Sequence, residues 1–238
     1  MTAVAVVLAI VIWLATIHRV SQPGQSIVKP AFINDQPTDA HNLRCIALTA
    51  MVATLYVPPI ATFIDEAVGR PGTAATAMFA LMVVGTGELQ MALRCVALEP
   101  RRARAGRVGR GAWLIGLITT MAVALALGEP TSTDVTLPWG SGDQLAWMAV
   151  YWGAWLAWCG AAGLRAGFIA TRYARRVPSA ITRVSLRFLI VGTVALVTYS
   201  VAKALVTASV VGGVGPPRGV TALTKMTVVL MAIAAIGT

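Results

Sequence analysis

Charged residues are scarce in this sequence. Only 12% of its 238 residues are charged, whereas 57% are hydrophobic. A soluble globular domain usually carries about 25% charged residues, so the composition excludes an ordinary soluble domain. The mean hydropathy of +0.76 points the same way. The sequence therefore predicts an integral membrane protein.

Side chains that commonly carry out chemistry are also few. The chain has three cysteines, Cys45, Cys95 and Cys159, and two histidines, His18 and His41. No two cysteines have the spacing of zinc ligands, and we expect all three to be buried as small hydrophobic residues. The sequence has neither a Walker A motif nor a Gly-x-Gly-x-x-Gly motif after a strand. We therefore predict no metal, no cofactor and no enzymatic activity.

Apolar runs long enough to cross a membrane dominate the chain. A helix needs about 20 apolar residues to cross roughly 30 Å of hydrocarbon. Seven runs come close to this length and predict an all-α, polytopic bundle of seven transmembrane helices in one domain. The first run has no basic residue before it, which favours an uncleaved helix over a signal peptide. The runs cover residues 2–18, 43–63, 73–94, 111–128, 144–164, 187–209 and 220–238.

Positive charges are concentrated in every second segment that connects these runs. Short cytoplasmic segments retain Lys and Arg, and the segments after the first, third and fifth runs hold fifteen of the nineteen positive charges. Most acidic residues fall in the intervening segments. We therefore predict an outer N-terminus and an inner C-terminus in a bacterial plasma membrane. The fifteen residues are Arg19, Lys29, Arg44, Arg94, Arg101, Arg102, Arg104, Arg107, Arg110, Arg165, Arg172, Arg175, Arg176, Arg183 and Arg187.

The net charge of +10 does not require a nucleic-acid partner. Anionic headgroups attract basic residues beside helix ends by about 1 kcal/mol each, so we expect membrane lipids as partners and no nucleic acid. Arginines after the fifth run recur at helical spacing. They predict either a docking face for headgroups or an acidic cytoplasmic protein, or a solvated extension of the span. The residues expected at a lipid or partner contact are Arg101, Arg102, Arg104, Arg172, Arg175 and Arg176.

Three charged residues fall inside predicted spans. Lys203 and Lys225 lie near the outer ends of the sixth and seventh spans, and Glu88 lies near the inner third of the third span. Lys203 can extend to the outer interface, pair with an outer acid such as Asp65 or Glu66, or join Lys225 in a positive pocket for an anion. Glu88 is a candidate for proton or cation coupling, since acids within spans commonly serve ion pathways. The alternative is a glutamate paired with inner arginines.

Aromatic residues follow one face of the fifth span. Trp147, Tyr151, Trp155 and Trp158 are spaced by four, four and three residues, whereas Trp152 lies off that face. Aromatic belts gather at helix ends, but this stripe follows most of the span. It predicts either the wall of a hydrophobic ligand pocket or packing against neighbouring helices or lipid.

Small residues and prolines predict two local features. Pro58 and Pro59 should bend the second span near its outer end, because neither residue has an amide hydrogen to donate. Another face of the fifth span favours close helix contacts, through Gly153, Gly160, Ala161, Gly163 and Gly167.

Several segments resemble a family of actinobacterial membrane proteins that are described as transporters and whose N-terminal half has seven spans. The resemblance rests on "VPPIATFIDEAVG" at the end of the second span, the basic segment after the third, "YWGAWLAW" in the fifth and "LRFLIVGTVALVTYSVAKAL" in the sixth. It implies a seven-span fold and a transporter-like role. Members usually continue into a cytoplasmic domain of unknown function, so we expect this chain to be either part of such a protein or a shorter relative.

The sequence thus leaves two functions open. One is a transporter-like module that handles a solute, in which Glu88, Lys203, Lys225 and the aromatic stripe line a ligand or ion path. The alternative is a membrane sensor or anchor that signals to a cytoplasmic domain or partner through its arginine-rich inner face.

Overall fold

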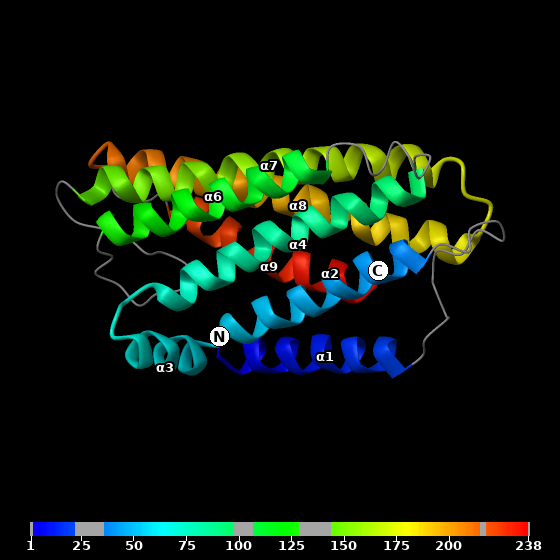
Figure 1. Ribbon diagram of the computed structural model, residues 1–238, viewed down its shortest axis with the longest axis horizontal. Coiled ribbons are helices and arrows are strands. Elements are labelled where there is room, and N and C mark those ends of the chain that lie inside the picture. Colours follow the sequence, from blue (N-terminus) through cyan, green and yellow to red (C-terminus); the bar gives the residue numbers. More distant parts are fainter. Residues whose placement is uncertain (1, 22–35, 98–106, 129–143, 215–217, 238) are drawn as a thin grey trace.

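The computed structural model is built of helices (Figure 1). It describes residues 2–21, 36–97, 107–128, 144–214 and 218–237, and every named element in these ranges is an α-helix. The all-α prediction is therefore confirmed for the described part of the chain. The helices are α1 (Thr2–Ser21), α2 (Gln36–Leu55), α3 (Pro58–Val68), α4 (Thr73–Ala97), α6 (Arg107–Gly128), α7 (Leu145–Ala174), α8 (Ala180–Val211) and α9 (Arg218–Gly237).

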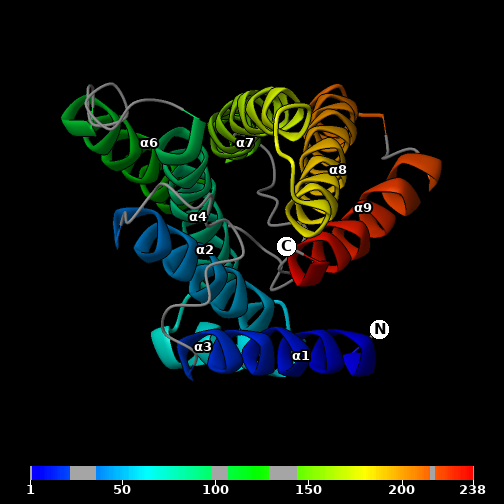
Figure 2. The ribbon, with the colours of Figure 1, turned by 90° about the vertical axis from the view of Figure 1, so that its right-hand side faces the viewer.

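Most helices run along the long axis of the molecule, and consecutive helices pack against each other (Figure 1). α7 packs against both α6 and α8, α8 packs against α9, and α4 packs against α2 and α7. Viewed along the long axis, α7, α8 and α9 form one row, and α6, α4, α2 and α1 form a second (Figure 2). The contacts of α7 with α4 and α6 join the rows, and the largest hydrophobic core lies around these three helices.

Several helices are apolar enough for a membrane. By length and composition, three helices can cross one, or four if the bent pair α2 and α3 counts as one span. α1 and α9 hold shorter apolar stretches, Ala9–His18 and Ala222–Met231. Each predicted span lies in a helix, except that the second is divided between α2 and α3. The three qualifying stretches are Thr73–Arg94, Gly111–Gly128 and Thr182–Val211.

The predicted bend in the second span is a complete break. α2 ends at Leu55, and α3 leaves it at an angle of 83°. Val57 has an extended backbone, as the residue before a proline usually does, and Pro58 and Pro59 occupy the first positions of α3. Proline is favoured there because the first helical amides have no partner within the helix. The prediction of one bent helix over residues 43–63 is thus corrected to two helices.

Charged side chains fasten the turn between α3 and α4. Both carboxylate oxygens of buried Asp65 accept backbone amides, from Gly72 and Ala74, at 2.8 Å each. Arg70 donates to the carbonyl of Ala126, near the end of α6, at 2.7 Å. These bonds satisfy backbone groups that helix ends leave free, and they tie the start of α4 to α3 and α6.

Glycines allow α7 and α8 to approach closely. A β-carbon at Gly167 would lie 2.9 Å from Oγ1 of Thr193, and one at Gly163 would lie 3.0 Å from Val197. Gly160 lies next to Ser200 in the same way, with an ordinary contact of 3.7 Å. The predicted close contact is therefore confirmed for three glycines. It is wrong for Gly153 and Ala161, which are exposed, and nothing lies within 4 Å of a β-carbon built at Gly153.

Candidate functional site

Five aromatic side chains fill the core between α4, α7 and α8. Phe79 lies 5.0 Å from Trp152 and 5.0 Å from Trp155 between ring centroids, and Trp155 lies 5.6 Å from Tyr199. Tyr151 contacts both Phe79 and Trp152. All these pairs are edge-to-face, which is the arrangement that the ring quadrupoles favour. We call Phe79, Tyr151, Trp152, Trp155 and Tyr199 the aromatic core.

Lys203 reaches this aromatic core from α8. Its side chain is only 2% exposed, and Nζ lies 4.2 Å from the ring centroid of Trp152. A cation over an indole face is attracted by the ring quadrupole, by about 2 kcal/mol or more when water is excluded. The expectation that Lys203 extends to the outer interface is therefore wrong, because the residue faces α7 inside the bundle. Both oxygens of Asp65, one of its two expected partners, accept backbone amides instead.

Two polar atoms of the aromatic core, the Tyr151 hydroxyl and Nε1 of Trp155, lack a hydrogen-bond partner among the described residues. Trp155 is fully buried, and its Nε1 makes no hydrogen bond to any part of the chain that the structure describes. Its ring lies 6.1 Å from Trp152, the residue that Lys203 contacts. Most buried N–H groups in proteins are bonded, so a donor left over beside a buried ammonium suits a ligand with hydrogen-bond acceptors.

The predicted aromatic stripe divides between three environments. Tyr151 and Trp155 belong to the aromatic core, whereas Trp147 is exposed. Trp158 is half-buried and donates from Nε1 to Oγ1 of Thr86, at 3.0 Å. Trp152, which the stripe left out, is completely buried. α7 contacts α4 and α6 on one side and α8 on the other, so it buries a wider arc than a single stripe describes.

Glu88 lies beside an arginine of α2. Its Oε1 is 4.0 Å from Nη1 of Arg44 on α2, and its side chain is 21% exposed. This contact agrees with the alternative that Glu88 is paired with an arginine, and the carboxyl group is not deeply buried. Lys225 lies in α9, but its side chain is outside the described residues. Cys159 is buried as expected, and no group of His, Cys, Asp or Glu that could hold a metal occurs among the described residues.

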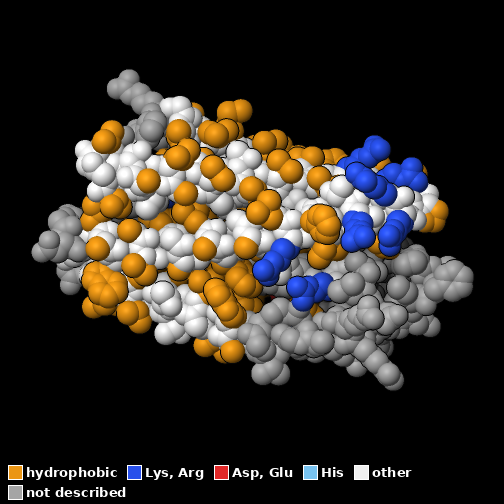
Figure 3. Space-filling view, turned by 90° about the horizontal axis from the view of Figure 1, so that it is seen from above, with side chains coloured by type: hydrophobic (Ala, Val, Ile, Leu, Met, Phe, Trp, Pro, Cys, Tyr) orange, Lys and Arg blue, Asp and Glu red, His pale blue; other side chains and the backbone are white. Residues whose placement is uncertain are grey.

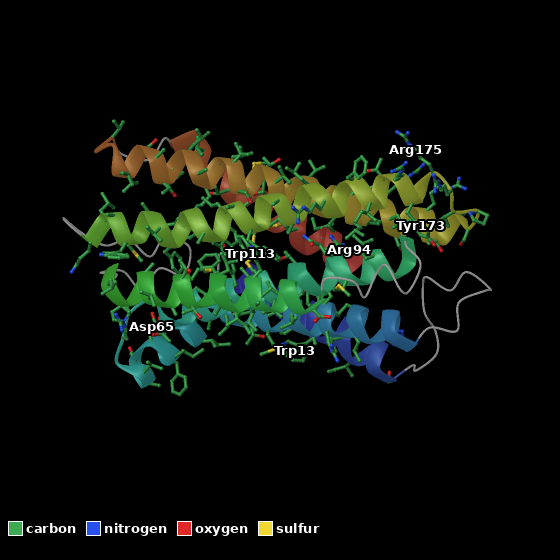
Figure 4. All side chains as sticks on the ribbon, turned by 45° about the horizontal axis from the view of Figure 1, so that its top comes forward. Trp13, Asp65, Arg94, Trp113, Tyr173 and Arg175 are labelled. Carbon is green, nitrogen blue, oxygen red and sulfur yellow. The ribbon has the colours of Figure 1, made fainter. Side chains whose placement is uncertain are left out.

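Arginines gather at one end of the molecule. On the face shown in Figure 3, Lys and Arg side chains lie towards one end, and hydrophobic side chains cover much of the rest. Arg172, Arg175 and Arg176 are exposed around the turn from α7 to α8, and Figure 4 labels Arg175 at this end. Tyr173 packs there beside Val177 and Leu186, and burial raises the pKa of its phenol above the ordinary value. The other expected contact residues, Arg101, Arg102 and Arg104, lie outside the described residues.

Comparison with known proteins found no match: no family model, no curated protein and no solved structure matches the chain.

Proposed function

We propose that the chain is a transporter-like module of a bacterial plasma membrane and that its solute site is the aromatic core with Lys203. In this proposal seven spans cross the bilayer, with the N-terminus outside, and α2 and α3 together form the second span. The solute is an anion, or carries hydrogen-bond acceptors, because the site offers an ammonium and an indole N–H.

The distribution of charge supports this orientation. Asp65 lies at one end of the molecule, whereas Arg94 and Arg175 lie towards the other (Figure 4). Cytoplasmic segments of membrane proteins are enriched in Lys and Arg. We therefore assign the arginine-rich end to the cytoplasm and the turn from α3 to α4 to the outside.

The single observation that carries the solute site is the burial of Lys203. The residue lies eight positions before the end of α8 at Val211, about 12 Å along the helix axis, and thus within the hydrocarbon layer of the proposed topology. A charged residue at midmembrane costs roughly 2.5–3.5 kcal/mol on insertion scales, and such residues commonly mark substrate pathways. Met in place of Lys203 would avoid this cost, so a functional role accounts for the charge.

A ligand screen tests the solute site. The purified full chain in detergent would be heated with inorganic anions, organic acids and amino acids, and its unfolding temperature recorded. We expect at least one class of anion to raise the unfolding temperature of the wild type and to have no effect on Lys203→Met. Trp155→Phe, which removes only the indole N–H donor, should weaken the effect, whereas Trp147→Phe on the exposed face of α7 should leave it unchanged.

Two outcomes would refute the solute site. Stabilisation that persists fully in Lys203→Met would place the ligand elsewhere, and a broad screen without any stabilising anion would remove the basis for solute handling.

A solute that binds at Lys203 also has to cross the membrane if the module transports it. Uptake into liposomes that contain the full chain, compared between wild type and Lys203→Met, measures this directly.

A sensor or anchor is the second candidate, favoured by the exposed arginines around the turn from α7 to α8. In that case solute binding at Lys203 would change the binding of an acidic cytoplasmic partner without any flux. Solute-dependent stabilisation together with the absence of uptake would favour this function over transport.

A further inference from the structure

Helices α7 and α8 form a hairpin. The end of this hairpin at the turn between the two helices carries positive charge, and the hairpin contains no acidic residue. From Gln144 to the end of the chain the sequence contains no Asp or Glu, yet six arginines lie between residues 165 and 187. All six side chains are exposed. Because no carboxylate of this hairpin neutralises them, they are free to bind an anion from outside the chain. They are Arg165, Arg172, Arg175, Arg176, Arg183 and Arg187.

The packing of α7 on α8 sets the level of each arginine. Gly160 lies against Ser200, and Gly167 lies against Thr193. Extending this antiparallel register by five residues brings Arg172 level with Phe188 and its neighbour Arg187. A second hydrophobic cluster, which includes Ala170, Val177 and Leu186, holds the two helices together at this end.

Exposed apolar side chains adjoin these arginines. Phe168 is 66% exposed on α7, and Phe188 is 37% exposed on α8. The guanidinium carbon of Arg172 lies 6.0 Å from the ring centroid of Phe168, one helical turn earlier. On both helices the apolar surface continues away from the turn, with Leu164 on α7 and Val191 on α8. Apart from Arg165, which lies one helical turn further from the end of the hairpin, the boundary between charged and apolar surface on α7 therefore falls between Phe168 and Arg172.

One arginine of the group already has a role within the turn. Nη2 of Arg183 donates to the carbonyl of Val177 at 3.0 Å and to that of Pro178 at 3.4 Å. It stabilises the turn and is therefore a poor candidate for an external anion. Among the described residues, Arg172 and Arg187 make no such bond to the turn, and they lie at the boundary described above.

We propose that Arg172 and Arg187, with Phe168 and Phe188 beside them, bind an anionic phospholipid at the cytoplasmic end of the α7–α8 hairpin. The two guanidinium groups hold the phosphate, for which the planar fork of Arg is well suited. The acyl chains lie over Phe168, Phe188 and the apolar residues beyond them. An acidic soluble protein would match the charges but leave the apolar surface uncovered, so the lipid fits both features. This site is separate from the one around Lys203 and does not depend on it.

Lipid binding to the purified full chain tests this site. We would titrate the protein in detergent with phosphatidylglycerol and, separately, with phosphatidylcholine of the same acyl chains, and count bound lipids by native mass spectrometry. We expect phosphatidylglycerol to bind more tightly and Arg172→Gln/Arg187→Gln to weaken it by about fivefold for each arginine removed. Arg44→Gln/Arg94→Gln removes the same charge from α2 and α4 at the same end, and it should change binding less than twofold.

Other outcomes would overturn the lipid site. An equal loss of affinity for phosphatidylglycerol in both double variants would show that only the net charge matters. Unchanged affinity in Arg172→Gln/Arg187→Gln would place the lipid elsewhere. Competition by glycerol phosphate at the same concentration as the lipid would show that the site takes free phosphate without the acyl chains. Arg172→Lys/Arg187→Lys keeps both charges but lacks the planar fork, so its affinity for phosphatidylglycerol should lie between that of the wild type and that of the glutamine variant. Affinity as low as that of the glutamine variant would show that positive charge at these two positions does not hold the phosphate.

Discussion

The two parts of the molecule on either side of Gln144 neutralise their charges differently. All nine acidic residues precede Gln144, whereas Lys203, Lys225 and seven arginines follow it without an acid. In the first part, Asp65 accepts two backbone amides and Arg44 lies beside Glu88. In the second part, Lys203 lies over an indole ring, and the arginines around the turn are exposed. At these positions the charges of the first part serve the fold, as Arg183 does in the second part, whereas we propose that Lys203, Arg172 and Arg187 bind other molecules.

The largest effect should come from removing the carboxylate of Asp65. Asp65→Ala leaves two buried backbone amides at the start of α4 without an acceptor. A hydrogen bond to a charged group contributes about 1.5–3 kcal/mol, so we expect the free energy of unfolding to fall by roughly 3 kcal/mol. Denaturant titration in detergent micelles measures this change. Glu66→Ala alters the exposed neighbouring acid and should have almost no effect, and an equal loss in both variants would contradict the proposed role of Asp65.

The second largest effect should follow from filling the contact between α7 and α8. Gly167→Leu places a side chain where even a β-carbon would lie 2.9 Å from Oγ1 of Thr193. Overpacking typically costs about 1–3 kcal/mol, and we expect about 2 kcal/mol of destabilisation by the same titration. Gly153→Leu is the matched control, since nothing lies within 4 Å of its β-carbon position. Leu has a higher helix propensity than Gly, so this control should not lose stability, and similar losses at both glycines would mean that the close contact at Gly167 is not responsible.

Removal of the ammonium of Lys203 should stabilise the protein, whereas the two substitutions above destabilise it. Burial of a cation in a membrane span costs roughly 2.5–3.5 kcal/mol of free energy, and contact of the cation with an indole ring offsets about 2 kcal/mol of this cost. Without added solute, Lys203→Met should therefore raise the free energy of unfolding by about 1 kcal/mol while abolishing anion binding. A decrease as large as that of Asp65→Ala would show that Lys203 serves the fold, as the charges of the first part do.

The smallest effect should come from Arg44. The Arg44 side chain is 65% exposed and lies 4.0 Å from Glu88, and exposed ion pairs rarely contribute more than about 1 kcal/mol. Arg44→Gln should lower the free energy of unfolding by less than about 0.5 kcal/mol, with less effect still in high salt. A loss above 1 kcal/mol that persists in high salt would indicate a second role for this arginine.

The sequence predicted the features that depend on local composition. The apolar runs identified the helices, Pro58 and Pro59 marked the change of direction after α2, and Gly163 and Gly167 marked a close helix contact. Each of these follows from the geometry of one short segment. A short stretch of sequence is sufficient for such predictions, because the backbone hydrogen bonds of a helix and the size of a residue do not depend on distant parts of the chain.

Other features depend on which helices become neighbours, and the sequence did not reveal them. Trp152 was assigned to a different face of α7 because the spacing of four aromatic residues suggested one stripe, whereas contacts on both sides of α7 bury a wider arc. The depth of Lys203 alone allows three environments, namely the outer interface, a pair with an outer acid, or an anion pocket with Lys225, and does not choose between them. The bonds of Asp65 to Gly72 and Ala74 join residues seven and nine positions apart across a turn, and no short pattern reports them.

The position of Trp152 and Lys203 on consecutive helices has a consequence for biosynthesis. In the proposed topology, synthesis delivers α7 and α8 to the bilayer as a hairpin before α9 has been made. The indole over the ammonium belongs to the preceding helix, so pairing within the hairpin covers this face of the cation during insertion. Lys203 can thus leave the insertion machinery already accommodated by its own hairpin.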